Sequence, residues 1–100
     1  NILISNDIKV NIAERTVIKK DKNIDLTSVE FKLLCLFMQN PNIVLTREII
    51  FGKLWDSEEN YIDDNTLSVY IKRLREKIED DSSKPNFIVT IRRVGYRWVV

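Results

Sequence analysis

The most constraining feature of the sequence is an apolar helix near its centre. Thr27 and Glu30 stand three residues apart in a capping-box pattern, in which each side chain can bond the other residue's backbone N–H, so a helix should begin here. An apolar run follows to Met38, and the helix should end before Pro41, because the residue before a proline avoids helical angles. Apolar residues take up most of the helix circumference. This segment is therefore predicted to be the central buried helix of the domain.

The length of 100 residues predicts a single domain spanning 1–100, because a chain of this size forms one core and rarely two. No apolar run approaches the roughly 20 residues that a membrane helix needs, and no secretion signal is visible. We therefore expect a cytoplasmic protein.

Cysteine and histidine usage argues against catalytic and metal sites. Cys35 is the only cysteine, so it has no partner for an internal disulfide, and its place in the apolar run predicts a small core residue. The sequence has no histidine, which is the commonest general base and a common zinc ligand. We expect a protein that is not an enzyme, with no cofactor and no metal.

Short stretches rich in β-branched residues lie at both ends of the chain. The first four predict a half-buried antiparallel sheet, with strands at 2–4, 8–12, 16–19 and 23–26. The last two, 87–92 and 96–100, predict a hairpin whose turn, at 93–95, contains Gly95.

Two further helices are predicted in the part of the chain between the central helix and the C-terminal hairpin. Thr46 can cap a short helix that reaches Trp55, and an acidic loop at 56–64 separates it from a helix over 65–79. Helical spacing divides the last helix into two faces. Its buried stripe is Leu67, Ile71, Leu74 and Ile78. Its outer face is Asn65, Val69, Lys72, Arg73 and Glu76, flanked by Ser68 and Arg75 on one side and by Thr66, Tyr70 and Lys77 on the other.

The outer face of that helix is basic, and so is the end of the chain. Residues 1–64 carry 8 Lys and Arg against 11 Asp and Glu, whereas residues 65–100 carry 8 against 4. Such a helix fits the DNA major groove, where Arg or Lys can bond guanine and Val69 can contact a thymine methyl. Taken alone, it is more typical of a solvated amphipathic helix, and Glu76 on the outer face agrees with that alternative. The order helix, helix, basic hairpin favours a winged helix-turn-helix in the α+β class.

The sequence resembles the OmpR/PhoB family, the C-terminal effector domains of two-component response regulators. The resemblance spans nearly the whole chain. It rests on Leu26-Thr27 with Glu30-Phe31 and Leu33-Leu34, Asn40-Pro41, Leu45-Thr46-Arg47-Glu48, Leu54-Trp55, Asn65-Thr66-Leu67, the run from Val69 to Ile78, and the run from Ile91 to Trp98. It implies an N-terminal four-stranded antiparallel sheet, three helices and a C-terminal β-hairpin wing.

The resemblance also implies roles in binding double-stranded DNA. The matching positions of the recognition helix are Asn65, Thr66, Val69, Tyr70, Lys72, Arg73 and Arg75, with Arg73 as the expected base reader. The positions that match backbone contacts are Trp55, Thr90 and Tyr96. Arg92 matches a wing arginine that enters the minor groove, where a narrow groove concentrates negative potential. The sequence departs from the family at Asn65, at Tyr70 and at Arg93, which stands where the wing usually has glycine but could add a phosphate contact.

Further partners are implied in the same way. The acidic loop matches the family's transactivation loop, so Glu58, Glu59, Tyr61 and Asp63 are candidates for contact with RNA polymerase; a merely solvated loop is the alternative. The resemblance implies a phosphorylatable receiver domain, absent from this chain, and dimers on tandem DNA half-sites. The alternative function is a winged-helix module that holds a protein partner without binding DNA.

Overall fold

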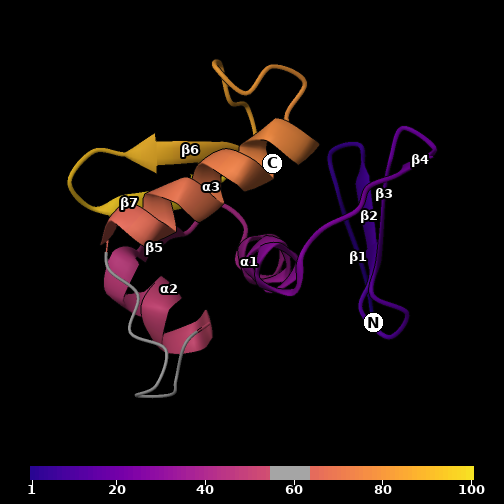
Figure 1. The fold of residues 1–100 in the computed structure, drawn as a ribbon, viewed down its shortest axis with the longest axis horizontal. Coiled ribbons are helices and arrows are strands. Elements are labelled where there is room, and N and C mark those ends of the chain that lie inside the picture. Colours follow the sequence, from indigo (N-terminus) through magenta and orange to yellow (C-terminus); the bar gives the residue numbers. More distant parts are fainter. Residues whose placement is uncertain (55–63) are drawn as a thin grey trace.

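The computed structural model describes residues 1–54 and 64–100, with only the backbone of residues 64 and 65. The N-terminal part forms the predicted four-stranded antiparallel sheet, with neighbouring strands in chain order (Figure 1). Its strands are β1 (Ile2–Ser5), β2 (Ile8–Asn11), β3 (Thr16–Lys19) and β4 (Lys22–Asn23). The fourth strand is shorter than the predicted 23–26, because the chain leaves the sheet there and crosses to the first helix (Figure 1).

Helix α1 (Ser28–Gln39) lies between this sheet and the rest of the molecule (Figure 1). The predicted capping box is confirmed: the Thr27 hydroxyl accepts from the Glu30 backbone N–H at 3.2 Å, and the Glu30 carboxylate accepts from the Thr27 N–H at 3.0 Å. Buried side chains lie on several sides of the helix, and Phe37 is fully buried. The helix is therefore central, as its apolar circumference predicts.

The C-terminal part joins two helices to a second antiparallel sheet. Its elements are β5 (Val44–Thr46), α2 (Arg47–Leu54), α3 (Asp64–Ile78), β6 (Ile88–Ile91) and β7 (Gly95–Trp98). The sequence did not predict β5, which pairs with β7 and makes the strand order β5-β7-β6. The predicted cap of α2 is confirmed, since the Thr46 hydroxyl accepts from the Ile49 N–H at 3.1 Å. Within the described residues, no helix has the length and apolar character needed to cross a membrane.

The turn between β6 and β7 corrects the prediction for Gly95. That glycine does not lie in the turn; it begins β7, and the residue of positive φ in the turn is Arg93, at 67°. Gly95 is required for a different reason. A Cβ atom at this position would lie 2.0 Å from the backbone carbonyl oxygen of Leu45 in the neighbouring strand. The missing side chain therefore allows β5 and β7 to approach each other.

The core surrounds α1, with the first sheet on one side of it and the inner face of α3 and the second sheet on the other (Figure 1). Trp98 is fully buried, with its ring centroid 6.5 Å from that of Phe37 and 5.6 Å from that of Phe87. The buried stripe of α3 is confirmed: Leu67, Ile71, Leu74 and Ile78 are each at most 1% exposed.

Cys35 packs against this core as a half-buried residue. Burial raises the pKa of its thiol, because a buried thiolate loses the stabilisation that water gives it. The prediction of a core residue in place of a reactive thiol therefore agrees with its surroundings.

Two buried carboxylates fix the C-terminal end of α3. Glu30 on α1 is 2% exposed and accepts from Lys77 Nζ at 2.5 Å. Burial alone raises the pKa of Glu30, but the hydrogen bonds from Lys77 and Thr27 hold it below its usual range. Glu79, which follows the helix, accepts from the backbone N–H groups of residues 86–88. Lys77, predicted on a flank of the outer face, thus serves the interior of the fold.

Candidate nucleic-acid interface

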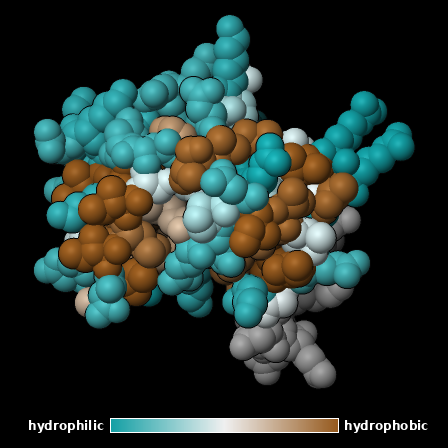
Figure 2. All heavy atoms as spheres, turned by 180° about the vertical axis from the view of Figure 1, so that it is seen from behind, coloured by the Kyte–Doolittle hydropathy of each residue, from teal (hydrophilic) through white to brown (hydrophobic). Residues whose placement is uncertain are grey.

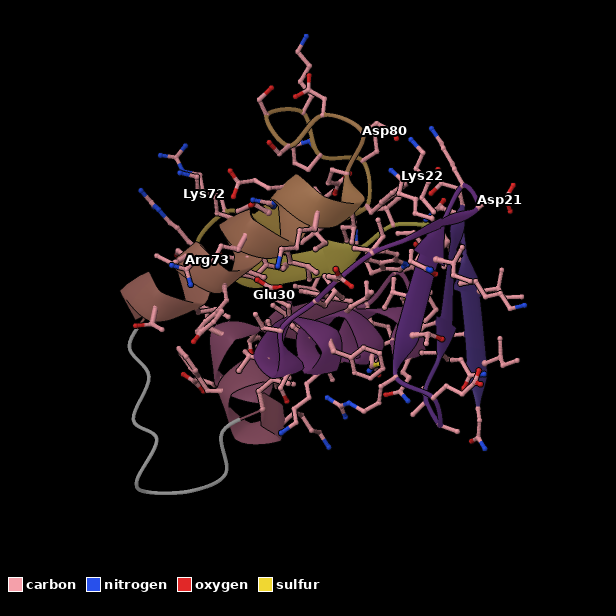
Figure 3. The ribbon with its side chains drawn as sticks, turned by 45° about the vertical axis from the view of Figure 1, so that its right-hand side comes forward. Asp21, Lys22, Glu30, Lys72, Arg73 and Asp80 are labelled. Atoms are coloured by element: carbon pink, nitrogen blue, oxygen red, sulfur yellow. The ribbon has the colours of Figure 1, made fainter. Side chains whose placement is uncertain are left out.

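The outer face of α3 is exposed and basic. Lys72 and Arg73 point away from α1 into solvent (Figure 3). Val69 is 43% exposed one turn earlier, and Glu76 is also exposed on this face. Neither Lys72 nor Arg73 forms an ion pair or hydrogen bond with the described part of the chain. Their charges are therefore available to a partner outside the domain.

The other residues predicted on the recognition helix differ in exposure. Thr66 and Tyr70 are half-buried, and Tyr70 packs against the core, which leaves one edge of each at the surface. The side chain of Asn65 lies outside the described residues. Direct access to a partner is thus greatest at Val69, Lys72 and Arg73.

Arg75 joins α3 to the hairpin. Its guanidinium donates to the carbonyl oxygen of Ile88 from Nε at 3.1 Å and from Nη2 at 2.7 Å, and Nη2 also donates to the Thr90 hydroxyl at 2.8 Å. It lies over the ring of Tyr96, 5.8 Å from the centroid, and burial lowers the pKa of the guanidinium. Because these bonds occupy much of its donor fork, Arg75 primarily holds the two elements in place.

The contacts of Arg75 also affect two residues of the hairpin. Thr90 is exposed, and because its oxygen accepts from Arg75, its hydroxyl proton can still be donated outward. Tyr96 is only 4% exposed, so its ring serves the core. The predicted contact of Tyr96 with DNA would need to come from its small exposed part.

The turn of the hairpin presents two further cations. Arg92 and Arg93 are both exposed, beside the exposed Val94. The turn and the first half of α3 lie at the same end of the molecule (Figure 1). Seen from behind, apolar side chains are interspersed with hydrophilic ones, and hydrophilic side chains project from this same end (Figure 2). The helix and the turn can therefore meet one extended polyanion.

Five predicted site residues lie outside the described residues. They are Trp55, for the DNA backbone, and Glu58, Glu59, Tyr61 and Asp63, for RNA polymerase. Their roles stay predictions from the sequence.

Comparison with known proteins identifies relatives along most of the chain. A family model described as "Transcriptional regulatory protein, C terminal" matches residues 21–98. An uncharacterized transcriptional regulatory protein of Bacillus subtilis, YcbL, is 43% identical over 90 residues, which are 90% of this chain and 39% of that protein. The regulatory protein VanR of Enterococcus faecium is 30% identical over 97 residues, which are 97% of this chain and 42% of VanR. The chain thus spans about two fifths of the length of these relatives.

Solved structures share the fold. The response regulator DrrB of Thermotoga maritima, described as an OmpR/PhoB homologue, matches with a TM-score of 0.89 and 33% identity over 99% of this chain and 44% of its own. The DNA-binding domain of RstA from Klebsiella pneumoniae, in complex with the RstA box, matches with a TM-score of 0.88 and 23% identity over 99% of this chain and 97% of its own. The likeness to RstA concerns the fold alone. Together they confirm the winged-helix fold predicted from the sequence.

Proposed function

Since this chain belongs to the family of C-terminal domains of transcriptional regulatory proteins, of the OmpR/PhoB type, we propose that it regulates transcription by binding a specific sequence in double-stranded DNA. The observation that carries this proposal is the pair Lys72 and Arg73, which are exposed on α3 without a partner among the described residues, at the same end of the molecule as the arginines of the β6–β7 turn. A helix of this width enters the major groove, while an arginine of the turn can enter the minor groove.

Each exposed residue then has a role that follows from its chemistry. Arg73 can donate two hydrogen bonds to one guanine, and Val69 can contact a thymine methyl. Lys72 contacts a phosphate as a point charge, and Arg92 enters the minor groove. Asn65, Thr66 and Tyr70 complete the helix side of the interface.

On the other side of the interface, the hydrogen bonds of Arg75 hold the hairpin in place against α3. Thr90 donates its hydroxyl proton to a phosphate. Tyr96, which pairs with Thr90 across the two strands, offers its small exposed part, and Arg93 adds a cation from the turn. Trp55 is assigned to the DNA backbone from the family resemblance alone. No catalytic activity is part of this proposal.

We expect Arg73→Ala to relax base preference at one or two positions of the binding site and to cost about 1 to 3 kcal/mol of binding free energy on the best sequence. The measurement is selection of binding sites from random duplex DNA by the purified domain, followed by titration of the selected duplex. Lys32→Ala is the matched control, because Lys32 is an exposed cation on α1. An unchanged motif for Arg73→Ala would contradict the base-reading role.

The same selection tests the function itself. The selected sites should contain two tandem half-sites about 10 to 10.5 bp apart if two copies bind side by side. Affinity should fall steeply with salt, because neutralised phosphates release counterions. The alternative, a winged helix that holds only a protein partner, would give no selected motif and an affinity for DNA that does not change with salt.

The whole protein is proposed to contain more than this domain. Residues 1–100 form the effector domain, and an upstream receiver domain, as in two-component response regulators, controls it. Support comes from the share of its relatives that the chain covers, 39% of YcbL and 42% of VanR. We propose that the full-length protein binds its DNA in the cytoplasm.

The acidic segment before α3 is proposed to contact RNA polymerase. We expect Glu58→Ala combined with Glu59→Ala to leave DNA affinity equal or slightly higher, because two negative charges near the DNA are removed. Transcription from the target promoter should fall in a reconstituted polymerase assay. Tyr61 and Asp63 belong to the same proposed contact. Unchanged transcription with unchanged DNA binding would leave a solvated loop as the explanation.

A further inference from the structure

A hollow of about 330 Å³ opens beside α1, away from the proposed DNA-binding face. Its wall comes from the turn between β2 and β3, from one side of α1 and from the last two residues of α2. On α1, Gln39 lines the hollow, whereas Glu30 bonds Lys77 of α3. These two α1 residues are separated by about two and a half helical turns, so they point in opposite directions. The hollow and α3 therefore lie on different sides of α1.

The floor of the hollow is apolar and partly open to solvent. Phe31 and Leu36 of α1 form its buried part. Ile12, Cys35 and Leu54 also line it, and these three are half-buried and pack against the core. Ligand sites are concave, mostly apolar and upward of roughly 300 Å³ in volume. The hollow is therefore large enough to cover the apolar body of a small molecule.

Three cations surround this floor. Arg15, Lys32 and Lys53 line the hollow and are exposed, and no carboxylate is among the described residues that line it. Glu14, next to Arg15 in the chain, accepts instead from the side-chain amide of Asn11 at 2.8 Å. Lys32 and Lys53 form no ion pair or hydrogen bond with the described part of the chain. The lining of the hollow thus carries a positive charge that an anion can balance.

Arg15 joins the charged part of the hollow to its apolar floor. Its guanidinium lies over the ring of Phe31, 4.6 Å from the centroid, and Nη2 donates to the Ser28 hydroxyl at 3.4 Å. A guanidinium has five N–H donors, so most of them stay available to a ligand. Its fork matches a carboxylate, which can accept two parallel hydrogen bonds.

We propose that this hollow binds a small fatty acid, with the carboxylate at Arg15 and the hydrocarbon chain on the apolar floor. The inference goes beyond the proposed function and does not depend on DNA binding. Burial of the chain supplies the hydrophobic part of the affinity, and the cations select an acid over a neutral amphiphile. A flexible chain can follow a floor whose side chains come from three separate parts of the fold.

The test is calorimetric titration of the purified domain with octanoate, octan-1-ol and acetate. Octanoate should saturate one site below about 10 mM. Octan-1-ol lacks the charge and acetate lacks the apolar body, so each should bind at least about tenfold more weakly. Arg15→Gln should weaken octanoate binding to a similar extent, and Arg15→Lys, which keeps the charge, should weaken it less. Lys9→Gln is the matched control, because Lys9 is an exposed cation on β2 that does not line the hollow.

Cys35 reports whether octanoate binds in this hollow. It lines the hollow and is the only cysteine in the sequence, so alkylation by iodoacetamide, followed by mass, measures access to this one place. Octanoate at ten times its dissociation constant should slow the alkylation about tenfold, because only the unoccupied fraction reacts.

A second variant keeps the test decisive if thermal unfolding shows that Arg15→Gln is not folded. Lys53→Gln changes an exposed side chain without a partner among the described residues, and it should weaken octanoate binding about threefold. Failure of octanoate to saturate, saturation that leaves Cys35 alkylation unchanged, or equal affinity for octanoate and octan-1-ol would each overturn the inference. None of these results bears on the proposed function, which the selection of DNA sites tests separately.

Discussion

Replacing Gly95 with alanine is expected to lower the free energy of unfolding by about 3 kcal/mol or more, because the added methyl group has no space. Its Cβ would lie 2.0 Å from the Leu45 carbonyl oxygen and 2.9 Å from the Thr46 Cα. These are backbone atoms of a paired strand, so no side-chain rotation can relieve the overlap. Either β5 separates from β7 or the hairpin moves. The measurement is equilibrium unfolding in urea, followed by tryptophan fluorescence.

Gly52→Ala is the matched control for Gly95→Ala. Gly52 is exposed within α2, and a Cβ atom there would have nothing within 4 Å. Alanine should therefore stabilise the domain by about 0.5 to 1 kcal/mol, through its higher helix propensity. Both substitutions add one methyl group, but Gly95→Ala should lower the free energy of unfolding and Gly52→Ala should raise it. Equal stability of both variants would show that β5 and β7 are not in close contact in solution.

Leu74→Ala is expected to lower the free energy of unfolding by about 2 to 5 kcal/mol, because it leaves a cavity in a fully packed core. Leu74 is 0% exposed on the inner face of α3. Similar losses are expected for Leu67→Ala and Ile71→Ala. Under conditions where the variant remains folded, its DNA affinity should match that of wild type, since Leu74 cannot reach a partner.

Val69→Ala is the control for Leu74→Ala on the same helix. Val69 is 43% exposed on the outer face, so its loss should change the free energy of unfolding by no more than about 0.5 kcal/mol. It should instead weaken binding to sites that contain a contacted thymine. Full stability of Leu74→Ala would mean that α3 is rotated relative to the arrangement described here.

Elements with a strong local signal were predicted well. The capping box at Thr27 fixed the start of α1, and the spacing of Leu67, Ile71 and Leu74 gave the inner face of α3. The strand β5 was not predicted, because its three residues are too few to show the alternation of apolar and polar side chains that indicates a strand. Gly95 was misplaced for a related reason. Glycine is typical of turns, but here a neighbouring strand requires it, and that neighbour is 50 residues earlier in the chain.

For the candidate site, the sequence predicted which way the side chains of α3 point, and their roles stay predictions. A helical wheel gives the direction of Lys72 and Arg73, since direction depends only on position within the helix. It cannot show that Lys77 pairs with Glu30 or that Arg75 bonds Ile88, because those partners come from other elements. The hollow beside α1 becomes visible only after packing, because its lining residues come from three separate parts of the chain.

The hydrogen bonds of Arg75 affect whether the protein or the DNA changes shape when the two bind. Three donor contacts to Ile88 and Thr90 join the helix to the hairpin, so the distance between the two elements is set before binding. The duplex must then adjust its bend and groove width to reach both. The energy of that adjustment depends on the flexibility of the base steps that lie between the two contacts. Base pairs that the protein never touches would thus contribute to operator choice, and loosening Arg75 would reduce discrimination at those positions first.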